Sequence, residues 1–317
     1  MAITQFSIVI PVYKNEKSIP RLIEELSKLN IALNNQIEAI FVIDGSPDQS
    51  YELLRNALNN LSFNAKLLIH SRNFGSFAAI RSGLQAANGK YFGIMAADLQ
   101  EPPELLINFF QALSSDECDV AIGIRTSRND PLLSRLFSKI FWDMYRRFIV
   151  KDMPAGGVDI FGCNHIFREQ LLKLDESRSS LIALVFWLGF RRKFIPYERL
   201  ARESGKSSWS LRKKMDYMMD SIFAFTDLPI RLLIRTGMIG CFISIILGGV
   251  VFISSIAGNI TVSGYAATML TLLFFGTINL LAIGLVGTYS WRGYENSKKR
   301  PLAIVSLVHE NNREDRE

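Results

Sequence analysis

The amino-acid sequence predicts an α/β protein with a mainly parallel sheet that helices cover on both faces. Within the first 130 residues, short apolar runs alternate with longer amphipathic stretches. The short runs are almost continuously apolar, which is typical of parallel strands buried on both faces. The expected strands are 6–12, 37–44, 65–70, 90–97 and 119–124. The expected helices lie near 16–29, 49–60, 75–88 and 102–113, an order that favours right-handed βαβ crossovers.

Composition and charge narrow the classes of partner. The 317 residues are enough for one large domain or two. The formal net charge of +6 fits either nucleic acid or an anionic membrane surface. A long uncharged apolar segment near the C-terminus favours the membrane, so we expect no nucleic-acid partner. The first apolar run contains Pro11 and has no basic segment before it, so it does not resemble a signal peptide.

The segment from Thr236 to Trp291 contains no charged residue. A bilayer core about 30 Å thick needs about 20 apolar helical residues, so this segment predicts two transmembrane helices, about 236–257 and 266–290. Two long core helices of a soluble protein are the alternative. Basic residues flank both ends, and the connecting loop is uncharged. The positive-inside rule therefore predicts an inner or plasma membrane protein with both termini in the cytoplasm.

The chain is expected to consist of a cytoplasmic domain (1–230), a membrane segment (231–292) and a cytoplasmic tail (293–317), disordered after about 303. Residues 131–150 and 209–226 carry apolar and basic residues at helical spacing, which predicts helices in the membrane interface. Ordinary helices packed on the sheet are the alternative. The three cysteines and three histidines are scattered, which argues against a disulfide or a Cys/His metal site.

Polar residues follow four of the expected strands, at the edge where ligands bind in such sheets. These residues are Asn15 and Glu16, then Asp44 and Asp48, then Arg72 and Asn73, and finally Asp98 and Gln100. Gly75 opens the helix after the third strand, and N–H groups at a helix start suit an anion. Together they predict a pocket for a nucleotide and for Mg²⁺ or Mn²⁺. An acidic turn that caps the next helix is the alternative for Asp98.

Four segments carry a resemblance to a known family: SIVIPVYKNEKSI, VIDGSPD, SRNFGSFAAIRSGL and AADLQEPPE. They resemble the family 2 glycosyltransferases of the GT-A fold. Within that family the chain is most similar to polyisoprenyl-phosphate glycosyltransferases, relatives of dolichol-phosphate mannose synthase and bactoprenol glucosyltransferases. The resemblance covers about residues 1–230, and the two predicted spans fit its two-helix members.

The resemblance implies roles for the strand-end residues. The nucleotide sugar would be bound by Pro11, Tyr13, Glu16, Asp44, Arg72 and Asn73, with Asp44 reading the nucleobase. Asp98 and Gln100 match the metal-holding pair of the family's D-A-D-x-Q motif. The first Asp of that motif is Ala96 in this chain. We therefore expect Asp98, Gln100, the diphosphate and water to hold Mg²⁺ or Mn²⁺.

The resemblance also implies residues for the acceptor and the leaving group. The lipid phosphate would be bound by Arg125, Arg135 and Ser138; contact with anionic headgroups is the alternative for Arg135 and Lys139. Asp159 would lie near the sugar and the acceptor, either as a base or to orient the sugar. The diphosphate would be covered by Arg199, Arg202, Lys206, Ser207 and Trp209, with Arg202 as a bidentate ligand. An exposed basic linker is the alternative for that segment.

The predicted activity is inverting transfer of one sugar to undecaprenyl phosphate at the cytoplasmic membrane face, with Asp98, Asp159 and Arg202 as catalytic residues. UDP-glucose is the first choice of donor; GDP-mannose, UDP-GlcNAc and UDP-aminoarabinose remain open. A processive polysaccharide synthase is disfavoured because no Q-x-x-R-W segment is present. A non-catalytic membrane protein that binds nucleotide sugars is the alternative from another class. Small residues in both spans would permit close helix packing. A homo-oligomer is expected on this ground, and packing within one chain is the alternative.

Overall fold

The computed structural model describes most of the chain, and its contacts divide the chain into two compact units. The described residues are 4–126, 142–143, 145–147, 150–154, 158, 160–176, 179–200, 211–257 and 264–311. The first unit is Met1–Met215 together with Arg300–Glu317, and the second is Asp216–Lys299.

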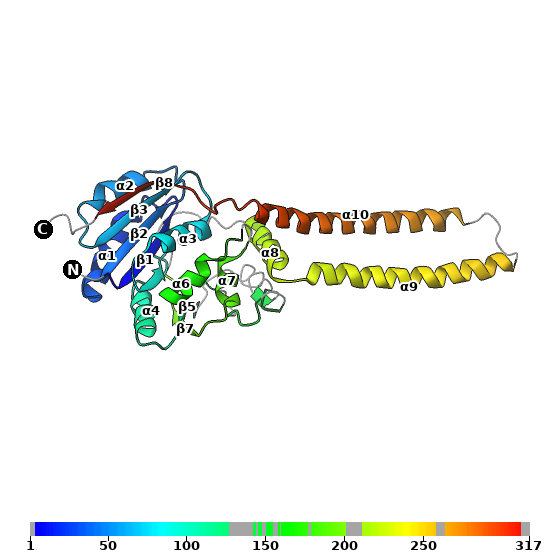
Figure 1. Cartoon of the computed structure of the whole chain (residues 1–317), viewed down its shortest axis with the longest axis horizontal. Helices are drawn as coiled ribbons and strands as arrows, with labels where there is room; N and C mark the ends of the chain where they lie inside the picture. Colours follow the sequence, from blue (N-terminus) through cyan, green and yellow to red (C-terminus); the bar gives the residue numbers. More distant parts are fainter. Residues whose placement is uncertain are drawn as a thin grey trace. The chain divides into compact units, whose positions relative to one another are not determined.

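Within its described residues, the first unit contains a mixed sheet with the strand order β7-β5-β6-β4-β1-β2-β3-β8. Figure 1 labels neighbouring strands β1, β2, β3 and β8 of this sheet. The strands are β1 (Phe6–Val12), β2 (Ile37–Ile43), β3 (Asn64–His70), β4 (Tyr91–Ile94), β5 (Val120–Arg125), β6 (Phe161–Asn164), β7 (Arg192–Tyr197) and β8 (Val305–Asn311). The central pairs β4–β1, β1–β2 and β2–β3 are parallel, as is β5–β7. The pairs β4–β6, β5–β6 and β3–β8 are antiparallel. The predicted α/β class with a mainly parallel sheet is therefore confirmed.

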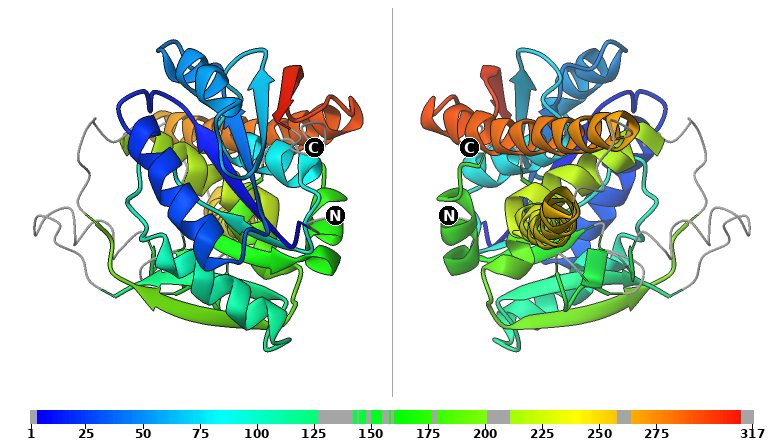
Figure 2. Two further views of the ribbon diagram at one scale, coloured as in Figure 1. Left: turned by 90° about the vertical axis from the view of Figure 1, so that its left-hand side faces the viewer. Right: turned by 90° about the vertical axis from the view of Figure 1, so that its right-hand side faces the viewer.

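Helices cover the sheet on both faces, as both views of Figure 2 show. They are α1 (Ile19–Ala32), α2 (Ser50–Leu58), α3 (Ser76–Ala86), α4 (Glu104–Ser114), α6 (His165–Leu172) and α7 (Leu181–Trp187). On β4, Gly93 faces Leu106 and Phe110 of α4. The ring of the preceding residue, Phe92, lies 4.8 Å from the guanidinium of Arg168 on α6. Because neighbouring side chains of a strand point to opposite faces, α4 and α6 cover opposite sides of the sheet.

The C-terminal residues correct the expectation of a disordered tail after about 303. Val305–Asn311 forms β8, which pairs with the open edge of β3. Lys66 and Glu310 form an ion pair of 3.4 Å across the two strands, and the Tyr51 hydroxyl lies 3.2 Å from His309 Nε2. The prediction was wrong because the charged end HENNREDRE concealed a short β-rich run that satisfies the exposed N–H and C=O groups of an edge strand.

The second unit is helical. It contains the end of α8 (Leu211–Phe225), together with α9 (Leu228–Ile256) and α10 (Tyr265–Ser297), which include the two predicted spans. In the described part of the chain, one stretch, Phe274–Ser297, is long and apolar enough to cross a membrane. Arg292 of α10 donates to the Asp220 carboxylate of α8 at 2.6 Å. Residues 209–226 are thus largely helical, as predicted, whereas most of 131–150 lies outside the described residues.

Close packing of α3 on the sheet gives a test of the fold. A Cβ atom at Gly83 would lie 2.3 Å from Val9 Cγ1 in the central strand. We expect Gly83→Val to destabilise the protein by at least about 2 kcal/mol, because the extra carbons overpack a stiff, buried neighbour. The thermal unfolding midpoint of the purified chain in detergent measures the effect. Gln85→Val, which adds the same residue at an exposed position of α3, is the matched control and should change stability by no more than about 0.5 kcal/mol.

Candidate active site

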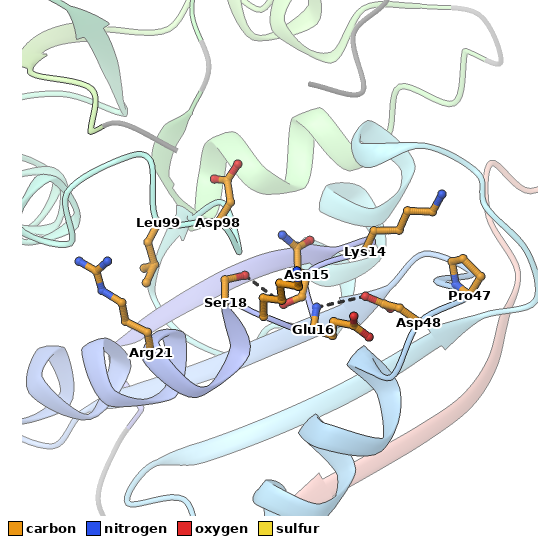
Figure 3. A pocket seen from close by; sticks show the side chains of 10 residues that line it. Lys14, Asn15, Glu16, Ser18, Arg21, Pro47, Asp48, Asp98 and Leu99 are labelled. Carbon is orange, nitrogen blue, oxygen red and sulfur yellow. Dashed lines mark hydrogen bonds between the residues drawn. The ribbon is translucent and has the colours of Figure 1, made fainter. Parts of the chain in front are cut away.

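A cavity of about 330 Å³ opens where the loops that follow β1, β2 and β4 meet. It lies at the carboxyl ends of three parallel strands, the edge of the sheet where the sequence predicts a ligand. Its lining consists of Lys14, Asn15, Glu16, Lys17, Ser18, Arg21, Pro47, Asp48, Asp98 and Leu99 (Figure 3). The structure thus brings together four of the predicted strand-end residues: Asn15, Glu16, Asp48 and Asp98.

Reciprocal hydrogen bonds join the first two of these loops. The backbone N–H of Glu16 donates to Asp48 Oδ2 at 3.1 Å, and the N–H of Gln49 donates to Glu16 Oε2 at 3.1 Å. Ser46 Oγ donates to Asp48 Oδ1 at 2.6 Å. Burial raises the pKa of Asp48, but the bonds from Ser46, Ser50 and Glu16 outweigh it and hold the pKa below its usual value. The Asp48 carboxylate is therefore charged at neutral pH and fixes one wall of the cavity.

Asp98 and Gln100 point to different surroundings because the residue between them turns the chain. Leu99 has φ +54°, a left-handed conformation that costs a non-glycine residue about 1–2 kcal/mol. Asp98 is half-buried and lines the cavity. Gln100 is 8% exposed, and its Oε1 accepts a 2.6 Å hydrogen bond from Arg199 Nη2. Such strain persists where the surrounding structure enforces it, commonly at functional sites.

The oxygen donors present suit a divalent cation that is held largely by the substrate. Among the described residues, no three Asp, Glu, His or Cys side chains gather in a way that could hold a metal ion. Ala96 offers no ligand, and Gln100 Oε1 accepts a bond from Arg199, so the role of Gln100 as a metal ligand remains a prediction. The Asp98 carboxylate faces the cavity, and Mg²⁺ commonly binds through one or two carboxylates together with substrate phosphates. Asp98 fits that arrangement.

Asp44 lies outside the lining of the cavity and is engaged within the protein. Its side chain is 4% exposed, and Oδ1 lies 2.9 Å from His70 Nδ1. The backbone N–H groups of Phe74 and Gly75 donate to Oδ1 and Oδ2, each at 2.8 Å. The N–H of Gly75, at the helix start where the sequence analysis expected an external anion, thus binds Asp44. Its role in reading the nucleobase remains a prediction.

The other residues predicted to bind the nucleotide sugar lie near these loops. Pro11 belongs to β1, and the N–H of Tyr13, which is 38% exposed, donates to Asn15 Oδ1 at 3.0 Å. Arg72 is exposed and lies 4.0 Å from the centre of the Phe74 ring. The Asn73 side chain donates to the backbone carbonyl of Asp44 at 3.1 Å.

Of the residues predicted to bind the acceptor or the diphosphate, the structure describes Arg125 and Arg199. Arg125 ends β5, where it pairs with Tyr197 of β7. The other residues predicted to lie at the acceptor, the sugar or the diphosphate are outside the described residues: Arg135, Ser138, Lys139, Asp159, Arg202, Lys206, Ser207 and Trp209.

Three cations of the cavity carried no role in the sequence analysis: Lys14, Lys17 and Arg21. Lys14 and Lys17 flank Asn15 and Glu16, and Arg21 follows Lys17 by four residues. In the expected helix 16–29 that spacing would place both side chains on one face, which was the available signal, although Lys17 lies in the turn before α1.

Comparisons with known proteins show the family of the chain. Residues 7–174 match the family described as glycosyl transferase family 2. The chain is 31% identical to a Bacillus subtilis protein named as the glycosyltransferase CsbB, over 94% of this chain and 90% of that protein. It is 30% identical to the undecaprenyl-phosphate 4-deoxy-4-formamido-L-arabinose transferase of Yersinia pestis, over 96% and 94%. The chain belongs to glycosyl transferase family 2 and is a glycosyltransferase.

Solved structures resemble part of the chain at low sequence identity. One is glucosyl-3-phosphoglycerate synthase from Mycobacterium tuberculosis in complex with Mn²⁺, UDP-glucose and phosphoglyceric acid. It has a TM-score of 0.46 and 14% identity, and the match covers 69% of this chain and 78% of that one. Another is S. aureus TarS in complex with UDP-GlcNAc, with a TM-score of 0.42 and 17% identity over 70% and 67%.

The internal bonds of Asp44 predict a pH dependence of stability. Burial raises the pKa of Asp44, but the bonds from His70, Phe74 and Gly75 hold it below 3.8, its usual value. The stabilisation is therefore fully present above the unfolded pKa and is lost as the pH falls through the lower folded pKa. We expect the gap in thermal midpoint between the parent and Asp44→Asn to narrow as the pH falls below ~4. A gap that is the same at pH 3 as at pH 7 would contradict this account.

Proposed function

We propose that the chain transfers one sugar from a nucleotide diphosphate sugar to undecaprenyl phosphate at the cytoplasmic membrane face, with inversion at the anomeric carbon. The observation that carries the proposal is the half-buried carboxylate of Asp98 in a cation-lined cavity at the strand ends of a family 2 glycosyltransferase. The name of the Yersinia relative supports a polyprenyl phosphate as acceptor. The apolar stretch Phe274–Ser297 supports a membrane location for that acceptor.

In this reaction an oxygen of the lipid phosphate attacks the anomeric carbon opposite the nucleotide diphosphate, which leaves. A divalent cation, when bound, neutralises charge on the departing diphosphate. Asp98 would hold that cation, and Lys14 and Lys17 would add positive charge beside it. Arg202, Lys206 and Ser207 would contact the same diphosphate.

The acceptor needs little activation by a base. A phosphate monoester has a second pKa of about 6, so its attacking oxygen is largely deprotonated at neutral pH. Asp159 would therefore act chiefly to orient the sugar, while Arg125, Arg135 and Ser138 would hold the lipid phosphate.

The identity of the donor follows from a direct assay. We propose UDP-glucose, with GDP-mannose, UDP-GlcNAc and UDP-aminoarabinose as the alternatives. Purified chain is incubated with undecaprenyl phosphate, Mg²⁺ or Mn²⁺ and each labelled nucleotide sugar. Label in the organic-extractable lipid supports the proposal and identifies the donor. A labelled polymer would instead indicate a synthase, and donor binding without transfer would indicate a non-catalytic binder.

Asp98 gives the test of the metal site. We expect Asp98→Asn to lower kcat/KM for lipid glycosylation by at least about 100-fold, because the amide removes the charge that holds the cation against the diphosphate. Glu104→Gln, which neutralises an exposed carboxylate in the first turn of α4, is the control and should retain parent activity. Undiminished metal-dependent turnover in Asp98→Asn would remove Asp98 from the metal site.

Membrane topology gives a separate test. If both predicted helices cross the membrane, a cysteine at Gly264 is exposed outside the cell and one at Ser297 faces the cytoplasm. We expect an impermeant maleimide added to intact cells to label Gly264→Cys but not Ser297→Cys, and to label both after lysis. The parent chain, in which Cys118 and Cys163 are buried, gives the background. Equal labelling of both variants in intact cells would contradict the two-span topology.

A further inference from the structure

A buried histidine links the ends of two neighbouring strands. β2 and β3 are parallel, and Ile43 pairs with Ile69, so Asp44 and His70 follow at matching positions. His70 Nδ1 lies 2.9 Å from Asp44 Oδ1, and His70 Nε2 lies 2.9 Å from Ser82 Oγ on α3. The His70 side chain is fully buried. A polar chain of this kind, satisfied at both ring nitrogens, fixes the orientation of each member.

The same aspartate holds the loop 71–75. Both carboxylate oxygens of Asp44 accept backbone N–H bonds from that loop, at Phe74 and Gly75. Gly45 has φ +59°, and a Cβ atom there would lie 2.4 Å from the Asn73 nitrogen, so the two backbones touch. His70 also meets the Phe74 ring edge to face, at 5.5 Å between ring centres. The loop is therefore held on the Asp44 side by hydrogen bonds and on the His70 side by packing.

We propose that His70 is a positioning residue that, through Asp44, sets the geometry of the loop 71–75 for binding of the nucleotide sugar. The proposal rests on the proposed function, because Arg72 and Asn73 of this loop are the residues expected to bind the nucleotide sugar. Preorganising such a loop lowers the free energy that binding would otherwise lose in ordering it.

In the hydrogen bond between His70 and Asp44, the histidine must be the donor. A carboxylate only accepts hydrogen bonds, so His70 Nδ1 carries the hydrogen toward Asp44. The Ser82 hydroxyl can donate to Nε2 or accept from it, so it satisfies either charge state of the ring. Removal of the imidazole leaves a buried carboxylate oxygen with one partner fewer, and such a group pulls its remaining partners out of position or admits water.

Three variants separate this role from general stability. His70→Leu introduces an apolar side chain of similar bulk and removes both hydrogen bonds. His70→Asn places an amide N–H where Nδ1 stands, so it retains the bond to Asp44. Ser82→Ala removes only the bond to Nε2. It also changes a half-buried helix position by one oxygen atom, so it tests the link if His70→Leu does not fold.

The first measurement needs no substrate. Hydrogen exchange of peptides that contain Phe74 and Gly75 is followed in the full chain in detergent. We expect exchange of these amides to rise about tenfold in His70→Leu and less in Ser82→Ala, and to stay near the parent rate in His70→Asn. Unchanged exchange in His70→Leu would overturn the clamp, whatever the enzyme's substrate. If His70→Leu does not fold, unchanged exchange in Ser82→Ala would do so.

The second measurement links the clamp to the donor. In the lipid-glycosylation assay we expect His70→Leu to raise KM for the nucleotide sugar about tenfold with a smaller change in kcat, and His70→Asn to restore it. Faster exchange with an unchanged KM would overturn the positioning role. If even the parent transfers no sugar to lipid, the proposed function has failed, while the exchange result still decides the clamp.

Discussion

The backbone hydrogen bonds that pair β1 in parallel with β2 and with β4 determine where the loops that line the cavity begin. Val12 pairs with Ile43, so the loops after β1 and β2 leave the sheet at the same level. β4 ends three residues earlier, where Ile94 pairs with Val9. Met95 continues the pairing through its N–H bond to the Val9 carbonyl, and the chain then reaches the edge at Asp98. Three loops thus meet at one level because a fixed register sets their starting points.

Charge at this edge is divided between structure and ligand binding. Glu16 and Asp48 accept hydrogen bonds that join two loops, so their negative charge is already partly compensated. Asp98 is the third carboxylate of the cavity and is half-buried. Lys14, Lys17 and Arg21 add three positive charges to the same lining. A cavity with this balance suits a ligand that carries several negative charges, such as a diphosphate with one divalent cation.

The sequence was informative where burial is continuous and misleading where it is not. The first five strands were predicted because most of their residues are apolar and buried, which leaves short, nearly continuous apolar runs in the sequence. β6 and β7 were not predicted. β6 has only four residues, and β7 lies at the sheet edge and contains Arg192, Lys193 and Pro196, so neither gives a continuous apolar run. β8 was missed because most of its side chains are exposed, so its sequence carries no burial signal. Edge strands are specified by a free neighbouring edge, which a sequence pattern does not display.

The same reasoning explains why two strand-end aspartates, equivalent in the sequence, differ in the folded chain. Asp44 and Asp98 both follow apolar strands and both match a family motif. Asp44 meets two backbone N–H groups and a histidine, and each of these donors would cost about 1–3 kcal/mol if a ligand displaced it and left it buried without a partner. Asp98 is half-buried and lines the cavity, where a ligand can reach it. Which aspartate faces the cavity therefore depends on how residues distant in the sequence fold around each one, and it is Asp98 that lies in the lining.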